Sequence, residues 1–192
     1  FIRSVEDSLG KQDMVLAADF GHGAISANCT KMLSCKAPFL AVNTQANAGN
    51  RGFHTISKYR TADYISIAEH ELRLEMRDLK SSVGELISKL YERVDVPAVT
   101  VTRGRSGCIV SKRNCCAYSV PALARNIVDR VGCGDALLAI TSLAVKLNVD
   151  EEMVGFLGNV AGALAVETMG NKKAISKKRI KQYVHSLFAQ TM

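Results

Sequence analysis

The chain has 192 residues, enough for one domain of ordinary size that buries roughly 70% of the surface its unfolded form exposes. Its residues are 47% hydrophobic and 22% charged, with 14 glycines and three prolines, a composition that argues against disordered and collagen-like classes. No purely apolar run reaches the length of about 20 residues that a membrane-spanning helix needs, so we expect no membrane association.

The formal net charge of +7 favours an anionic partner, which could be nucleic acid, acidic lipid or a phosphorylated small molecule. Six basic residues crowd one stretch near the end: Lys172, Lys173, Lys177, Lys178, Arg179 and Lys181. No aromatic residues interleave with these lysines, so we interpret the stretch as a solvated helix face rather than a nucleic-acid contact.

Six cysteines show no C-x-x-C pair and no Cys/His cluster with zinc spacing, so a structural metal site has little support. Reduced thiols suit a cytoplasmic protein, and the charged first residues do not form a signal peptide. Because the sequence opens with Phe1 rather than Met, we expect it to be part of a longer chain.

Apolar runs of strand length alternate with segments of helical period along the chain. In chain order, the pattern predicts a strand at 14–20, a helix at 24–34, strands at 39–42 and 64–68, helices at 69–78 and 83–94, a strand at 98–102, a hairpin of 108–111 with 115–120, and helices at 136–147, 151–168 and 180–188. This order predicts an α/β fold with a mostly parallel sheet and one domain over residues 1–192. Ligands of such sheets bind beyond the carboxyl ends of the strands.

The turn at residues 131–135 leads into the apolar helix predicted at 136–147. Gly132 and Gly134 permit a close backbone approach, so free N–H groups there could hold a phosphoryl group at the positive end of the helix. Asp135 follows directly and could accept the proton of an attacking hydroxyl. The alternative interpretation, that Asp135 only caps its helix, stays open.

A second glycine pattern, Thr102-x-Gly104-x-x-Gly107, follows the predicted strand 98–102 and could wrap a nucleotide phosphate, or could be an ordinary tight turn. Neither glycine loop completes G-x-G-x-x-G, and no G-K-[ST] occurs. Classical Rossmann and P-loop interpretations are therefore disfavoured.

These residues resemble the ribokinase-like (PfkB) family of sugar kinases. The run Asp129-Arg130-Val131-Gly132-Cys133-Gly134-Asp135 is similar to the D-T-x-G-A-G-D signature of the family, and Thr102-x-Gly104-x-x-Gly107 is similar to its nucleotide loop. The resemblance implies a three-layer sandwich with helices on both faces of the sheet, whose amino-terminal part and lid are absent here. It also implies Asp135 as the catalytic base, with an anion hole formed by Gly132, Cys133 and Gly134.

Further roles follow from the same resemblance. Thr102, Gly104, Gly107 and Asn159 would bind the nucleotide, Asn159 on the adenine side. Glu71 matches the glutamate of an N-x-x-E motif for Mg²⁺, and Asp129 matches a residue around which the family often builds a monovalent-cation site for K⁺. This chain departs from the family pattern at Ala68, Arg130 and Cys133, where an Asn, a Thr and a small Ala are usual.

Within the family, the run Asp19-Phe20-Gly21-His22-Gly23-Ala24 resembles the D-Y-x-K-G-A of the heptose-phosphate kinase half of bifunctional ADP-heptose synthesis enzymes. That likeness implies substrate contacts at Asp19 and Asn43, and a fused nucleotidyltransferase-like domain as a partner. His22 replaces the lysine, and the Asn-rich loop at 43–47 replaces a more acidic one, so the sugar could differ.

We therefore expect an ATP-dependent phosphotransferase that acts on a hydroxyl of a sugar or sugar phosphate, with ATP, Mg²⁺ and K⁺ as cofactors. A homodimer is left open. One alternative is a catalytically inactive nucleotide- or sugar-binding module of a larger bifunctional protein. The other alternative, a nucleic-acid binder, is disfavoured for the reasons given above.

Overall fold

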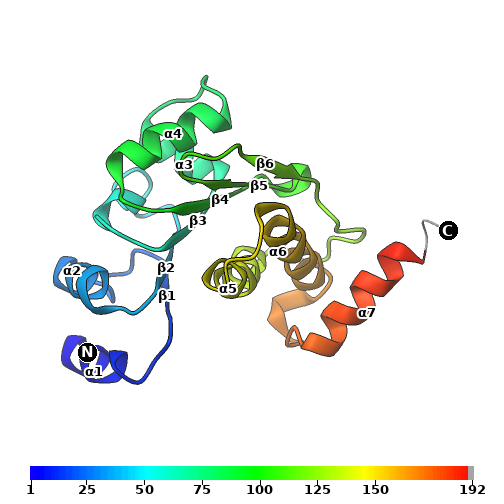
Figure 1. Cartoon of the computed structure of the whole chain (residues 1–192), viewed down its shortest axis with the longest axis horizontal. Coiled ribbons are helices and arrows are strands. Elements are labelled where there is room, and N and C mark those ends of the chain that lie inside the picture. The colour runs from blue at the N-terminus through cyan, green and yellow to red at the C-terminus, as the bar shows by residue number, and fades with distance from the viewer. Residues whose placement is uncertain (190–192) are drawn as a thin grey trace. The chain divides into compact units, whose positions relative to one another are not determined.

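The computed structural model describes residues 1–189, which fall into two compact units (Figure 1). The first unit contains residues 1–102 and 111–117, and the second contains residues 103–110 and the chain from 118 onward. The expectation of a single domain over residues 1–192 stays a prediction.

The first unit is built on four parallel strands: β1 (Val15–Asp19), β2 (Leu40–Thr44), β3 (Tyr64–Ala68) and β4 (Ala98–Thr102). They pair in chain order, with Ala17 opposite Val42 and Ile65 opposite Val99. Strands β3 and β4 match the predicted bounds because each is a short, almost fully buried run of mainly apolar and β-branched residues, the pattern of an interior parallel strand. The prediction of a mostly parallel sheet is confirmed.

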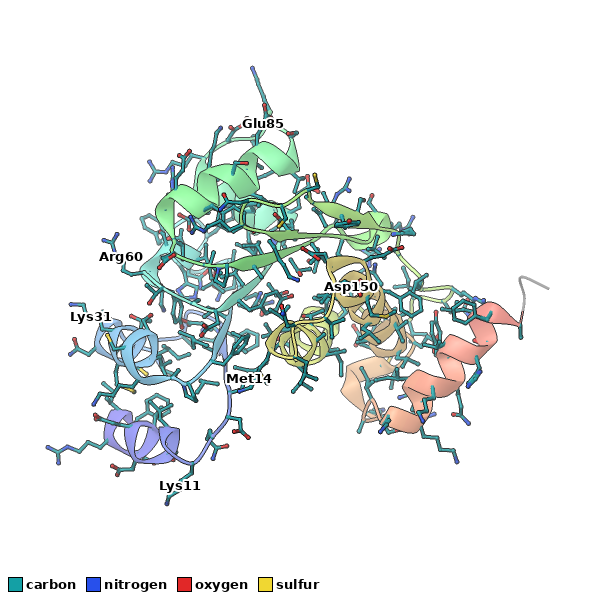
Figure 2. The ribbon with its side chains drawn as sticks, in the orientation of Figure 1. Lys11, Met14, Lys31, Arg60, Glu85 and Asp150 are labelled. Atoms are coloured by element: carbon teal, nitrogen blue, oxygen red, sulfur yellow. The ribbon has the colours of Figure 1, made fainter. Side chains whose placement is uncertain are left out.

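Four α-helices belong to this unit: α1 (Ile2–Leu9), α2 (Ala27–Lys36), α3 (Glu69–Met76) and α4 (Val83–Arg93). Figure 1 shows α2 and α4 on the same side of the four strands. The apolar residues of α4 repeat at helical spacing and are buried along its whole length, and the side chain of Ser82 caps its first turn. In Figure 2, Lys11 and Lys31 extend away from the ribbon, as expected for charged side chains left in solvent. Helix α1 was not predicted.

The second unit contains three helices and the base of a hairpin, whose turn at residues 111–117 belongs to the first unit. Strand β5 (Cys108–Lys112) pairs antiparallel with the short β6 (Tyr118–Val120). The helices are α5 (Cys133–Lys146), α6 (Glu151–Val166) and α7 (Lys177–Phe188). Helix α6 contacts both α5 and α7. A small core forms where residues of β5 and β6 meet these helices: Cys108, Val110, Val120, Ala144 and Val154.

Two local predictions were wrong in this unit. Helix α5 begins at Cys133 rather than at 136, because Gly132 takes a left-handed backbone (φ +79°) and lets the helix start within the glycine turn. The apolar sequence of this helix predicts a buried element, but Leu143 is 49% exposed and Leu147, directly after the helix, is 76% exposed.

No helix within residues 1–189 combines the length and the apolar character that a membrane span requires. The basic residues before and within α7 lie at the surface, and Arg179 donates to the Ala174 carbonyl oxygen. This exposure agrees with a solvated helix face.

Helix α6 carries two glycines that provide a matched test of its packing. A Cβ at Gly155 would lie 2.6 Å from Val120 Cγ2, whereas a Cβ at Gly162 would meet nothing within 4 Å. We expect Gly155→Ala to lower the free energy of unfolding by about 1–3 kcal/mol through overpacking. We expect Gly162→Ala to raise it by about 0.5–1 kcal/mol, because alanine is the better helix former. Urea unfolding of both variants measures the difference, and equal midpoints would contradict this packing.

Candidate functional site

The residues singled out in the sequence lie in both compact units. Four belong to the first unit: Asp19, Asn43, Glu71 and Thr102. Eight belong to the second unit: Gly104, Gly107, Asp129, Gly132, Cys133, Gly134, Asp135 and Asn159. Most of them follow the carboxyl end of a parallel strand or open a helix, which are the places where α/β folds bind ligands.

The turn before α5 is pinned by the Asp129 carboxylate. One of its oxygens accepts the Val131 N–H at 3.0 Å, and the other accepts the Gly170 N–H at 2.9 Å. The N–H groups of Val128 and Asp129 both donate to the Val166 carbonyl oxygen at the end of α6. The Val131 N–H first, and then the Gly170 N–H, hold the pKa of the Asp129 carboxyl below its usual range. The turn is therefore fixed to the chain that follows α6.

The first turn of α5 leaves backbone donors at the surface. The Cys133 N–H makes a long contact of 3.4 Å to the Arg130 carbonyl oxygen, while the Asp135 N–H has no acceptor within residues 1–189. A Cβ at Gly134 would meet nothing within 4 Å, so a ligand can approach the backbone there. Burial raises the pKa of the Cys133 thiol, and the neighbouring Gly134 N–H opposes part of that rise. The turn thus offers an open cradle at the positive end of a helix.

The carboxylate of Asp135 lies exposed beside this cradle. It has neither a hydrogen-bond nor an ion-pair partner in the part of the chain that the structure describes. A capping aspartate would accept a backbone N–H of its own helix, as Asp150 accepts the Met153 N–H at the start of α6. The structure therefore supplies no capping bond for Asp135, which weakens the alternative interpretation of this residue.

In the second glycine pattern, close packing explains why one position, 107, is a glycine. Gly107 has φ +80°, and a Cβ there would lie 2.0 Å from the Val120 carbonyl oxygen. Its carbonyl oxygen accepts the Arg103 N–H at 2.8 Å and closes a tight turn. Gly104, also with positive φ, has open space around it. The nucleotide roles of Thr102, Gly104 and Gly107 stay predictions, and Gly107 has a structural reason of its own.

Asn159, predicted on the adenine side of a nucleotide, is buried in the middle of α6. Its amide nitrogen donates to the carbonyl oxygens of Val120 and Pro121, at 3.1 and 2.9 Å. These bonds tie α6 to the end of β6 and use the two N–H donors of the amide. A role at the nucleotide stays a prediction, and it would fall to the amide oxygen.

In the first unit, Asp19 ends β1 and is only 4% exposed. Its carboxylate accepts the Gly21 N–H at 3.1 Å and the Tyr59 hydroxyl at 2.9 Å, and it pairs with Lys58 Nζ at 2.5 Å. Burial alone would raise the pKa of Asp19, but the bonds from Lys58, Tyr59 and Gly21 outweigh it and hold the pKa below its usual value. Substrate binding by Asp19 stays a prediction, and the observed contacts make it a structural anchor.

Three residues around Asp19 were not predicted: His54, Lys58 and Tyr59. His54 Nε2 lies 2.9 Å from the Asp19 carbonyl oxygen and 3.3 Å from its Oδ1. Burial first, and then the Asp19 carboxylate, raise the pKa of Tyr59, so this hydroxyl stays protonated and donates. No motif marks these residues, and their distance of 35 or more positions from Asp19 hides the contact from any local pattern.

Glu71, predicted as a metal-binding residue, joins two backbone segments. Its Oε2 accepts the Ala68 N–H at 3.0 Å, and its Oε1 accepts the Ala46 N–H at 2.9 Å. Asn43 likewise donates its side-chain N–H to the Ser66 carbonyl oxygen, between neighbouring strands. Residues 1–189 contain no group of three or more His, Cys, Asp or Glu side chains that could hold a metal ion by themselves.

Comparison with known proteins identifies the family. A family model described as the pfkB family carbohydrate kinase matches residues 27–178. The chain belongs to this family. The resemblance drawn from the Asp129–Asp135 run is therefore confirmed.

The relatives identified by sequence are bifunctional proteins. The chain is 27% identical over 165 residues to the Bifunctional protein HldE of Koribacter versatilis (strain Ellin345), which covers 84% of this chain and 33% of the relative. It is 29% identical over 188 residues to the Bifunctional protein HldE of Pseudomonas aeruginosa (strain UCBPP-PA14), covering 94% of this chain and 37% of the relative. The chain thus spans about a third of the length of these curated relatives.

Solved structures of similar fold are ribokinase-type enzymes. The ribokinase of Arabidopsis thaliana, complexed with ribose and ATP, superposes with a TM-score of 0.76 at 16% identity over 94% of this chain and 58% of that one. Phosphofructokinase-2 of Escherichia coli, in complex with potassium, gives 0.76 at 14% identity over 96% and 61%. The predicted ribokinase-like α/β fold is confirmed.

Asp19, His54, Lys58 and Tyr59 form a cluster, called here the Asp19 cluster, whose stability should depend on pH. Because the folded pKa of Asp19 lies below its ordinary value of 3.8, its stabilisation is complete above about pH 5 and is lost as pH falls through the folded pKa. At neutral pH we expect Asp19→Asn to lower the free energy of unfolding by about 2–4 kcal/mol, since it leaves Lys58 without its carboxylate. Chemical unfolding at a series of pH values measures both effects.

The difference between wild type and Asp19→Asn should narrow on acidification to pH 3. The matched control is Asp7→Asn, at an exposed position of α1, which should leave stability unchanged. A difference of the same size at pH 7 and pH 3 would contradict the role of the ionised carboxylate.

Proposed function

We propose that this chain is the phosphoryl-transfer part of a kinase that moves the γ-phosphoryl group of ATP to a hydroxyl of a sugar or sugar phosphate. One observation carries the proposal: the unpartnered carboxylate of Asp135 lies beside an open cradle of backbone at the start of α5. Membership of the PfkB family and the similarity in fold to ribokinase support it.

Each residue of the turn has a physical task in this reaction. The N–H groups at Gly132–Gly134 and the α5 dipole stabilise negative charge on the transferring group. Asp135 accepts the proton of the attacking hydroxyl as the new oxygen–phosphorus bond forms and the bond to ADP breaks. Asp129 keeps the turn in place through its two backbone bonds. Catalysis is then mainly positioning and charge stabilisation.

Mg²⁺ is proposed as the metal that accompanies the nucleotide, where it neutralises phosphate charge. The ion usually keeps several waters and binds substrate phosphates together with one or two carboxylates, so a complete protein cage is not needed. Glu71 fits a contact through water, since each of its oxygens accepts one backbone N–H and keeps further lone-pair capacity. K⁺ near Asp129 stays a prediction; the similar phosphofructokinase-2 was solved in complex with potassium.

A sugar phosphate is proposed as the acceptor, with heptose phosphate as the leading candidate. The support is the similarity to proteins named HldE and the net charge of +7, which favours anionic substrates. A homodimer, a fused nucleotidyltransferase-like domain and a cytoplasmic location stay predictions. The alternative of an inactive binding module is excluded as soon as phosphate transfer to any sugar is measured.

Replacing Asp135 by Asn tests the proposed base. The change removes the proton acceptor and keeps the size of the side chain, so turnover should fall by about 10²- to 10⁴-fold. The dissociation constant for ATP should stay within about twofold, because the backbone cradle is unaltered. Steady-state kinetics and calorimetry on the full natural chain measure the two quantities.

The matched control for this experiment is Glu152→Gln, an exposed acid in the first turn of α6, which should leave turnover unchanged. Wild-type turnover in Asp135→Asn would reject the role of Asp135 as the base.

A further inference from the structure

The first unit carries a pocket whose lining does not include Asp19. It has a volume of about 450 Å³ and lies where the loop at residues 52–55 meets the end of α3 and the last residue of α4. Its side chains include those of Phe53, Thr55, Leu74, Glu75, Arg77 and Arg93. This volume is within the range of small-molecule sites.

The pocket has an excess of positive charge. Glu75 is buried, and its Oε1 lies 3.4 Å from Arg93 Nη1, which also donates to the Glu75 carbonyl oxygen at 2.9 Å. The negative charge of Glu75 therefore compensates the positive charge of Arg93. Arg77 ends α3 in a left-handed conformation, and its guanidinium has no partner among residues 1–189. One cationic group thus remains uncompensated beside a second one that is already held in place.

The aromatic ring of Phe53 lies at the same pocket and is open to solvent. Phe53 is 94% exposed, so nearly all of its ring is accessible to a ligand. Leu74 adds a further apolar group to the lining. A planar ring laid on Phe53 would remove apolar surface from water and gain an aromatic pair.

We propose that this pocket binds an organic phosphate that carries a planar ring, of the nucleoside monophosphate class, at a site separate from the reacting nucleotide. Arg77 and Arg93 hold the phosphate, because guanidinium groups match phosphate oxygens in pairs and stay charged at all working pH values. Phe53 stacks on the ring. Thr55 lies beside them with a hydroxyl that can donate to the ligand.

The position of the pocket couples it to the Asp19 cluster through one loop. Phe53 precedes His54, whose ring donates to the Asp19 carbonyl oxygen. The Ser57 N–H donates to Glu75 at 3.3 Å, and the next residue, Lys58, pairs with Asp19. A ligand that immobilises Phe53 and Arg93 therefore restricts the same segment that surrounds Asp19. A ligand in this pocket could therefore regulate the protein through the segment around Asp19.

The test uses AMP as the probe, with adenosine and ribose 5-phosphate as comparators that lack the phosphate or the ring. Calorimetry on the full chain should show AMP binding at least about tenfold more tightly than either comparator, since each lacks one half of the recognised chemistry. Hydrogen exchange should slow on AMP binding in peptides that cover residues 47–58.

Two variants and a control assign the binding. Phe53→Ala and Arg77→Ala change exposed side chains that make no hydrogen bond or ion pair within residues 1–189, and each should weaken AMP binding roughly tenfold and abolish the protection of residues 47–58. Arg60→Ala is the control, because Arg60 is an exposed cation of the same segment outside the pocket and extends outward in Figure 2. It should bind AMP as wild type does.

Two results would overturn the proposal. One is the absence of AMP binding. The other is AMP binding that is unchanged in Phe53→Ala and Arg77→Ala, which would place the probe at the nucleotide loop instead. Neither result bears on Asp135, so this proposal and the proposed kinase reaction fail independently.

Discussion

A carboxylate that accepts two backbone N–H groups can join segments of chain that are distant in sequence, and the loops of the candidate site depend on this interaction. Glu71 joins the chain after β2 to the end of β3. Asp129 joins the turn before α5 to Gly170. Asp19 does the same with one N–H, a hydroxyl and an ammonium group. An unpaired carboxylate at the buried positions of Asp19 and Glu71 would cost several kcal/mol, so these two acids favour a single loop arrangement. The two backbone bonds of Asp129 hold its turn in the same way.

Asp135 differs from the other acids that the sequence analysis selected. Its carboxylate is exposed and has no bonding partner in the described part of the chain, while Asp19, Glu71 and Asp129 use their oxygens on the protein itself. A residue without a structural task is free to take a proton from a substrate. The free donor of the Asp135 backbone and the open space at Gly134 put the charge-stabilising groups next to it.

The sequence was sufficient for the strands and the family, and insufficient for the contacts between distant residues. Strands β3 and β4 agree with prediction at both ends because burial on both faces favours a run of mainly apolar and β-branched residues. The start of α5 was predicted three residues too late, because glycine disfavours a helix and Gly134 was assigned to the turn. In the structure the left-handed Gly132 forms the turn, and the helix begins directly after it. The anchoring roles of Asp19 and Glu71 depend on partners 25 to 40 positions away, which no motif or period encodes.

In the proposed reaction, the backbone at the start of α5 holds the transferring phosphoryl group. The most direct measurement is the amide nuclear magnetic resonance spectrum of the chain titrated with Mg²⁺ and a non-hydrolysable ATP analogue. We expect the Gly134 and Asp135 amide signals to move in step with nucleotide saturation, and to move more than those in the middle of α5. If the nucleotide binds while these two signals stay in place, the claim is contradicted.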